Sequence, residues 1–227
     1  MEETAHEYFG AMVEEYDSLL RRAVPRYDEM IERAITYVPS DKRDVLELGC
    51  GTGNFTVALS AHLPQAELTL VDASAEMLAC ARGRLPAERR VHCVESLFEE
   101  LVLEPASFDL ITSCISLHHV EDMGKLIERL FGLLRPGGHL LYADQMRGGT
   151  EAYHELNWGR MVDFWKRPGN LQPAEMDSLT EHRDLHDHHV SVMDQLEWMR
   201  AAGFVELDCV WRNWMWGVLA AKRPDAG

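Results

Sequence analysis

The sequence has no long hydrophobic run and no paired cysteines. No stretch approaches the ~18 consecutive apolar residues that a membrane helix needs. The start, Met1-Glu-Glu, is not followed by the basic and apolar segments of a secretory signal, so we expect a cytoplasmic protein with no membrane partner. The five cysteines show no C-x-x-C spacing, which favours free thiols in a reducing compartment over a disulfide scaffold.

Positive charge is also scarce, because 22 Lys and Arg residues stand against 38 Asp and Glu residues and give a net charge of -16. Such a charge repels polyphosphate chains, so we expect no nucleic-acid partner. What remains is a chain of 227 residues, 46% hydrophobic, which is the size of one α/β domain. We predict a single domain over residues 1–227, and a homodimer is compatible with this sequence.

Short β-like runs alternate with helical stretches in the middle of the chain. The runs cover residues 45–48, 68–71, 90–94, 108–112 and 139–143. This alternation predicts right-handed crossovers and a mostly parallel, doubly wound α/β sheet. An amphipathic helix over 192–202, stopped by Gly203, is followed by strands over 204–210 and 213–221 around a turn near Trp211-Arg212. This C-terminal antiparallel hairpin would complete a seven-stranded sheet.

Two segments lie outside the alternation. In residues 1–40, apolar residues from Tyr8 and Phe9 onward follow helical spacing with an interruption at Pro25, which predicts an N-terminal cover of two helices. Residues 144–190 are polar, rich in histidine and tryptophan, and contain breakers at Pro168-Gly169 and Pro173. We interpret this second segment as an inserted helical lid.

The segment Val45-Leu-Glu-Leu-Gly-Cys-Gly-Thr-Gly-Asn-Phe joins a buried strand to a helix that begins near Phe55. Glycines at 49, 51 and 53 allow a tight turn and let a ligand lie against bare backbone, and the helix N-terminus offers free N–H groups. The dinucleotide pattern G-x-G-x-x-G would put its last glycine at Asn54. The spacing therefore disfavours an NAD-dependent dehydrogenase, which stays an alternative.

The glycine segment, Glu47-x-Gly-x-Gly-x-Gly53, resembles motif I of class I S-adenosylmethionine (SAM) dependent methyltransferases. Asp72, which closes Leu-Thr-Leu-Val-Asp, resembles their motif II. The segments Phe108-Asp-Leu-Ile-Thr-Ser-Cys-Ile-Ser-Leu-His-His and Leu133-Leu-Arg-Pro-Gly-Gly-His resemble their fourth strand and the turn into the fifth. The resemblance covers residues 44–144 and implies methyl transfer from SAM to a small molecule, with S-adenosylhomocysteine as product and the lid and N-terminal helices enclosing the acceptor.

The resemblance also implies a set of cofactor-binding residues. Asp72 would accept hydrogen bonds from both ribose hydroxyls. Ser96 or Glu95 would accept the adenine amine, with Leu97 against the ring. The full predicted set is Tyr16, Arg22, Tyr27, Glu47, Gly49, Cys50, Gly51, Gly53, Asp72, Ala73, Met77, Glu95, Ser96, Leu97 and Cys114.

A second resemblance extends over most of the chain. Leu20-Arg-Arg-Ala-Val-Pro-Arg-Tyr27 resembles the Arg-Ser-Val-Pro-Gly-Tyr segment of bacterial carboxy-SAM synthases, and Ala202-Gly-Phe resembles their C-terminal part. It implies that Tyr27 contacts the cofactor and that Cys114 lines it through its backbone. The arginine that binds the extra carboxylate in those enzymes falls near Trp198, which carries no charge. A synthase acting in tRNA wobble-uridine modification is therefore the alternative and not the expected function.

Histidines supply the candidates for catalysis. His118 and His119 follow the fourth predicted strand, on the side where ligands of doubly wound folds bind, so either is a candidate general base. The alternative is that the pair packs against the cofactor or caps a helix. The cluster Glu181-His182-x-x-x-His186-x-His188-His189 follows no known metal-ligand spacing, so we expect a solvated lid and no metal. Because methyl transfer demands no invariant catalytic side chain, a non-catalytic SAM-binding protein is a further alternative.

Overall fold

The computed structural model describes the backbone of residues 13–227 and the side chains of residues 15–227. Tyr8, Phe9 and the predicted start of the first helix lie outside the described residues. Within the described residues, α2 (Val13–Ala23) and α3 (Tyr27–Thr36) precede the first strand and are separated at Pro25 as predicted. No helix of the described residues is long and apolar enough to span a membrane.

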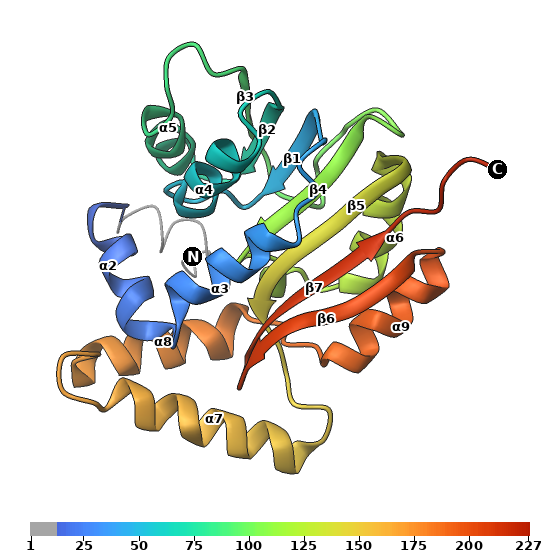
Figure 1. The fold of residues 1–227 in the computed structure, drawn as a ribbon. Helices are drawn as coiled ribbons and strands as arrows, with labels where there is room; N and C mark the ends of the chain where they lie inside the picture. Colours follow the sequence, from blue (N-terminus) through green and yellow to red (C-terminus); the bar gives the residue numbers. More distant parts are fainter. Residues whose placement is uncertain (1–12) are drawn as a thin grey trace.

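The central part of the chain alternates strands and helices (Figure 1). Its elements are β1 (Asp44–Leu48), α4 (Asn54–His62), β2 (Glu67–Asp72), α5 (Ala75–Gly83), β3 (Val91–Glu95), β4 (Phe108–Cys114), the short 3-10 helix η1 (Leu117–His119), α6 (Met123–Leu133) and β5 (Leu134–Gln145). The C-terminal part contains α7 (Glu151–Trp165), α8 (Pro173–His186), α9 (Val192–Ala202), β6 (Val205–Asn213) and β7 (Trp216–Lys222).

The strands form one seven-stranded sheet in the order β3-β2-β1-β4-β5-β7-β6. Strands β1 to β5 are parallel, and β7 runs antiparallel to both β5 and β6. The predicted doubly wound sheet with a C-terminal antiparallel hairpin is therefore confirmed. Because the chain order reverses between β1 and β4, the loops that follow these strands leave a crevice at their carboxyl ends.

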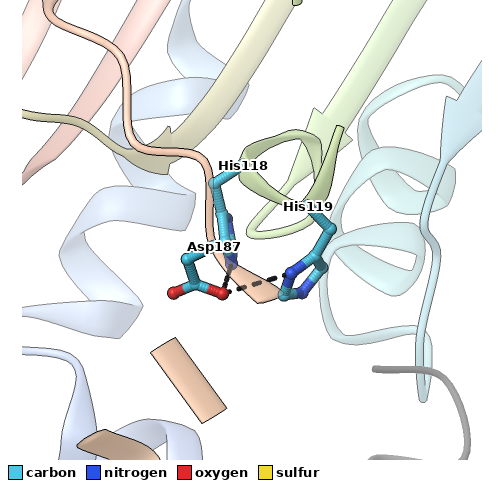
Figure 2. A group of neighbouring side chains, drawn as sticks. All are labelled: His118, His119 and Asp187. Atoms are coloured by element: carbon cyan, nitrogen blue, oxygen red, sulfur yellow. Dashed lines mark ion pairs between the residues drawn. The ribbon is translucent and has the colours of Figure 1, made fainter. Parts of the chain in front are cut away.

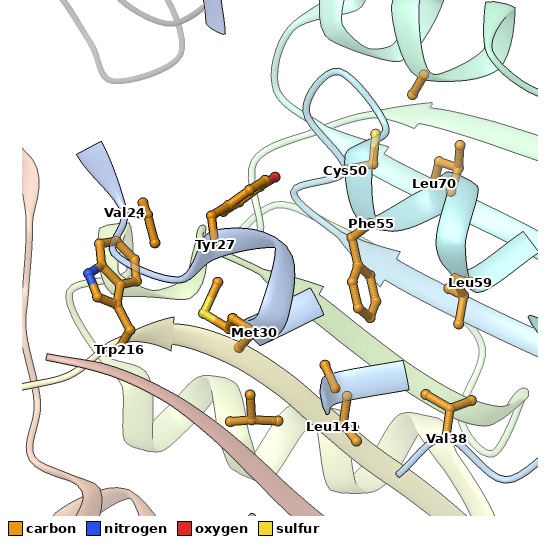
Figure 3. Packing of buried hydrophobic residues seen from close by; sticks show 14 of the residues in the cluster. Val24, Tyr27, Met30, Val38, Cys50, Phe55, Leu59, Leu70, Leu141 and Trp216 are labelled. Carbon is orange, nitrogen blue, oxygen red and sulfur yellow. The ribbon is translucent and has the colours of Figure 1, made fainter. Parts of the chain in front are cut away.

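The central strands β1 and β4 bury both of their faces, which explains why they are largely apolar, whereas the edge strands β3 and β6 are partly exposed. In β1, Val45 belongs to the apolar cluster shared with α3, α4 and α5, whereas its neighbour Leu46 belongs to the cluster shared with α6 and α9. Figure 3 shows the first of these clusters, in which Met30 of α3 and Phe55 of α4 pack above the sheet. Two helical layers thus hold the sheet and the loops at its carboxyl end.

The predicted hairpin turn near Trp211-Arg212 is wrong. Strand β6 continues to Asn213, and the turn lies at Trp214 and Met215. Trp214 takes a left-handed backbone conformation with φ of 55°. That conformation is typical of glycine or asparagine, so a tryptophan there gives no turn signal in the sequence.

The segment after β5 forms the predicted helical lid, made of α7 and α8, which lies at the carboxyl end of the sheet beside α2 (Figure 1). Polar contacts join the lid to α2, among them a hydrogen bond from Arg22 to the carbonyl of Asn170 at 3.1 Å. The indole Nε1 of Trp165 donates to the carbonyl of Ala23 at 2.7 Å, and Arg22 forms an ion pair with Glu175 at 2.8 Å. The lid and α2 are therefore held together over the crevice.

We predict that Gly53→Ala destabilises the fold by ~1–3 kcal/mol. Gly53 has φ of 90°, and a Cβ there would lie 2.8 Å from the Cα of Ala81 in α5. The matched control is Gly83→Ala at the end of α5, where a Cβ meets nothing within 4 Å. Urea unfolding of both variants is the measurement, and equal midpoints would contradict the proposed close packing of α4 on α5.

Candidate cofactor and acceptor site

A cavity of about 480 Å³, called the first cavity here, opens at the carboxyl ends of β1, β2 and β4. Its walls come from the glycine loop after β1, from the residues that follow β2 and β3, and from η1. The residues that line it are Tyr16, Gly49, Gly51, Asp72, Ala73, Ser74, Met77, Ser96, Leu97, Phe98, Glu99, Ile115, Ser116, His119, Val120, Glu121 and His188. This is the crevice where open α/β sheets bind ligands.

The glycine loop is shaped by close packing. Gly49 has φ of 64°, and a Cβ on it would overlap the side chain of Ser116 in the loop after β4. The amides of Gly49 and Cys50 both donate to the carbonyl of Val71, at 2.8 and 3.1 Å. Only glycine fits at position 49, and its bare backbone forms part of the cavity wall.

Asp72 joins the first two loops of the site. One carboxylate oxygen accepts the amide of Gly51 at 2.8 Å, and the other accepts the amide of Ser74 at 3.0 Å. Each carboxylate oxygen can accept a second hydrogen bond, and the side chain lines the first cavity. Asp72 is thus held at the position where it can accept hydroxyl donors from a ligand.

Glu47 is a buried carboxyl group, 1% exposed, beneath the glycine loop. Its Oε1 accepts the hydroxyl of Thr56 at 3.0 Å, but its Oε2 has no hydrogen-bond partner among the described residues. The pKa of Glu47 is raised to about 8, mainly by burial. The hydrogen bond from Thr56 opposes this rise, and the negative charge of Asp72 adds to it. The group lines a side pocket of about 20 Å³ next to the first cavity, together with Tyr27, Cys50 and Cys114.

The histidines after β4 meet two aspartates. The carboxylate of Asp144, at the end of β5, accepts the backbone amide of His118 at 3.0 Å and its Nδ1–H at 2.5 Å. Asp187, in the loop after α8, lies 3.2 Å from His119 Nδ1 and 3.7 Å from His118 Nε2 (Figure 2). Burial lowers the pKa of His118, but the charges of Asp144 and Asp187 outweigh it and raise the pKa to about 9. Burial and the neighbouring His118 lower the pKa of His119.

A second cavity of about 70 Å³ lies between α2, the lid and the histidines. Its lining is mostly aromatic and aliphatic, with Trp158, Met161 and Trp165 from α7 and His182 from α8. It shares Tyr16, Ile115 and His119 with the first cavity. These three residues therefore form a common wall between the larger first cavity and the smaller second one.

The structure brings most predicted cofactor residues together. Those that line the first cavity or its side pocket are Tyr16, Tyr27, Glu47, Gly49, Cys50, Gly51, Asp72, Ala73, Met77, Ser96, Leu97 and Cys114. Three others lie elsewhere: Arg22 pairs with Glu175, Glu95 pairs with Asp72 in the register of β2 and β3, and Gly53 is the N-cap of α4.

Several site residues were missed by sequence reasoning. Phe98 and Ser116 line the first cavity, and Asp144 and Asp187 hold the histidines. Phe98 follows Leu97 directly, so an aromatic residue next to the predicted adenine contact was an available signal. Nothing in the sequence links Asp144 or Asp187 to His118, because the three lie far apart along the chain.

Comparison with known proteins adds to this geometry. The methyltransferase domain family matches residues 46–140. A carboxy-S-adenosyl-L-methionine synthase of Aeromonas salmonicida is 30% identical over 229 residues, which cover 95% of this chain and 90% of that protein. The chain belongs to the class I SAM-dependent methyltransferase family. The predicted fold, enzyme class and cofactor, SAM, are thereby confirmed.

Other members of this methyltransferase family differ in their acceptors. A trans-aconitate 2-methyltransferase of Pseudomonas aeruginosa is 37% identical over 176 residues, covering 74% of this chain and 58% of that protein. A Haemonchus contortus phosphoethanolamine N-methyltransferase 2, solved in complex with SAM, shares the fold with a TM-score of 0.71 at 17% identity, covering 97% of this chain and 59% of that one.

The residues present fit SAM. The side pocket contains a buried carboxylate oxygen without a hydrogen-bond partner, on Glu47, which suits the ammonium group of the methionine part. Asp72 at the opposite side of the glycine loop suits the two ribose hydroxyls, and Leu97 and Phe98 provide apolar surface for the adenine ring.

We predict that Glu47 makes the ligand-free protein less stable as the pH rises. A folded pKa of about 8 against an ordinary value of 4.5 means that the folded state binds the extra proton between these two values. The free energy of unfolding should therefore fall through this window, by at most about 1.4 kcal/mol per pH unit.

The measurement is urea unfolding of the wild type and of Glu47→Gln from pH 5 to 8. The variant cannot ionise, so the difference in stability between the two proteins should grow with pH in favour of Glu47→Gln. A constant difference across the range would show that Glu47 has an ordinary pKa.

Proposed function

We propose that this enzyme transfers the methyl group of SAM to a small molecule bound in the second cavity. The observation that carries the proposal is the common wall of Tyr16, Ile115 and His119 between the two cavities. SAM supplies an electrophilic methyl group on a sulfonium. An acceptor in the second cavity would meet that group across this wall, with α2 and the lid excluding water.

The shape and chemistry of the second cavity support a particular class of acceptor. Trp158, Met161 and Trp165 offer apolar surface for the body of the molecule. His119 belongs to the common wall and His118 also lines the second cavity, so the nucleophilic atom would lie against these two polar groups. We therefore propose an acceptor with an apolar body and one oxygen or nitrogen nucleophile, contacted by His119.

The cofactor half of the proposal is tested by Asp72→Asn. Losing the charge removes charge-assisted hydrogen bonds to the ribose, and we expect SAM to bind 10- to 100-fold more weakly, the equivalent of ~1.5–3 kcal/mol. Calorimetric titration of ligand-stripped protein gives the affinity. Glu88→Gln, which removes an exposed charge away from the site, is the control and should bind like the wild type. Unchanged affinity in Asp72→Asn would remove the aspartate from the cofactor site.

The acceptor half is tested by Trp158→Ala, which alters the second cavity and leaves the first intact. We expect transfer of labelled methyl from SAM into a metabolite extract to fall about tenfold, the effect of ~1.4 kcal/mol, with unchanged SAM affinity. Leu185→Ala, an exposed position on α8, is the control. Equal transfer by both variants would place the acceptor elsewhere. SAM binding without transfer to any metabolite would favour a non-catalytic SAM-binding protein.

A carboxy-SAM synthase is the second candidate, because the Aeromonas salmonicida synthase matches nearly the whole chain. Trp198, where the resemblance expects an arginine, lies on α9 beside Gly124 of α6 and does not line either cavity. Tighter binding of carboxy-SAM than of SAM, with the mass of carboxy-SAM recovered from the protein, would support the synthase over the methyltransferase.

A further inference from the structure

Three ligand-type side chains converge beside the second cavity. One nitrogen each from His118 and His119 and one oxygen of Asp187 all lie within 4.8 Å of one another (Figure 2). Asp187 Oδ1 is 3.2 Å from His119 Nδ1 and 3.7 Å from His118 Nε2. In a tetrahedral site with ~2.0–2.1 Å bonds, neighbouring ligand atoms are about 3.3 Å apart. The two distances from Asp187 are thus close to the spacing that one metal ion requires, and the two histidine nitrogens lie within 4.8 Å of each other.

The surrounding residues orient two of these groups. Asp144 accepts the Nδ1–H of His118 at 2.5 Å, so Nε2, on the side of Asp187, is the ring nitrogen that would give up its proton to a metal. This carboxylate–histidine pair is the arrangement that commonly supports metal-bound histidines. The second oxygen of Asp187 lies 3.3 Å from His189 Nε2. Asp144 therefore supports His118, and His189 supports Asp187, next to the three converging atoms.

The charge balance of the cluster is unusual. The side chains of Asp144 and Asp187 are only 4% and 6% exposed, and every ion-pair partner that the described residues offer them is a histidine. Among the described residues, Asp187 Oδ1 has no hydrogen bond of regular geometry, although it lies 3.2 Å from His119 Nδ1. A buried carboxylate oxygen without a hydrogen bond is costly unless a cation compensates it. A divalent ion between the three groups would supply that compensation.

We propose that His118, His119 and Asp187 bind one divalent transition-metal ion. Two imidazoles and a carboxylate suit Zn²⁺ and its neighbours Co²⁺ and Fe²⁺, and exclude a preference for Mg²⁺ or Ca²⁺. All three residues line the second cavity, so the remaining coordination position faces it. A site with three protein ligands and one open position is the arrangement of catalytic metals rather than structural ones.

The role of the ion toward the acceptor rests on the proposed function. It would bind a hydroxyl oxygen of the acceptor, whose proton leaves to solvent, and hold the resulting oxyanion against the common wall. The bond between sulfur and methyl carbon then breaks with its electron pair staying on sulfur, and a bond between oxygen and methyl carbon forms. This favours oxygen over nitrogen as the methylated atom.

The experiment is a titration of chelator-treated full-length protein with Co²⁺, followed by visible absorption, and with Zn²⁺, followed by calorimetry. We expect one equivalent of each metal and displacement of Co²⁺ by Zn²⁺. His119→Ala and Asp187→Asn should each abolish the Co²⁺ spectrum. Asp144→Asn, which changes only the residue that supports His118, should weaken Zn²⁺ binding about 10- to 100-fold. His92→Gln, a histidine on β3 paired with Glu67, is the matched control and should bind like the wild type.

SAM affinity and circular dichroism of the same variants show whether each is folded, and they separate the two proposals. Asp187→Asn, at a residue that does not line the first cavity, should keep SAM affinity and lose the metal, which would support the site. Absence of stoichiometric metal binding in folded, SAM-binding wild type overturns it and leaves methyl transfer untouched. Binding that survives in both His119→Ala and Asp187→Asn would also overturn it, because the metal would then lie on other residues.

Discussion

The hydrogen bonds of Asp72 to the amides of Gly51 and Ser74 are the contacts on which the site depends. They tie the loop after β1 to the loop after β2, on either side of the crevice that the sheet order creates. The packing of Gly49 on Ser116 attaches the same loop to the third wall, after β4. Because the two helical layers fix the strands, these few contacts are enough to set the shape of the first cavity. The shape of the first cavity thus depends mainly on the backbone of the three loops that form its walls.

The parts predictable from sequence are those decided by local pattern. The doubly wound class of the sheet followed from the alternation of apolar runs with helical stretches, and the glycine loop followed from residues 49, 51 and 53, because backbone conformation and burial depend on neighbouring residues. The histidine cluster shows why the rest was hidden: His118, Asp144 and Asp187 come from three separate loops, and only the fold brings them together. Arg22 was predicted to bind the cofactor, but it forms an ion pair with Glu175 of the lid. No local pattern in the sequence reveals that the lid packs on α2. The position of the hairpin turn was predicted wrongly because Trp214 adopts a left-handed backbone conformation that tryptophan disfavours.

Acidic groups dominate the described surroundings of both cavities. Glu47 and Asp72 border the first cavity and its side pocket, Asp187 lines the second cavity, and Asp144 holds His118 from behind. SAM carries a sulfonium and an ammonium, so these carboxyl groups favour the positively charged cofactor electrostatically. After methyl transfer the sulfonium charge is gone, and the same field favours S-adenosylhomocysteine less. The net charge of -16, which argued against nucleic acid, is in this respect consistent with the chemistry.

Helix α2 contacts both the glycine loop and the lid. Its Asp17 accepts hydrogen bonds from Thr52 and Asn54 at the glycine loop, while Arg22 and Ala23 are bound by the lid. Its Tyr16 lines both cavities. A ligand leaving past this helix must break contacts that close the neighbouring space as well. Helix α2 thus borders the cofactor cavity and the proposed acceptor cavity at once, so a displacement of this one helix would open both of them.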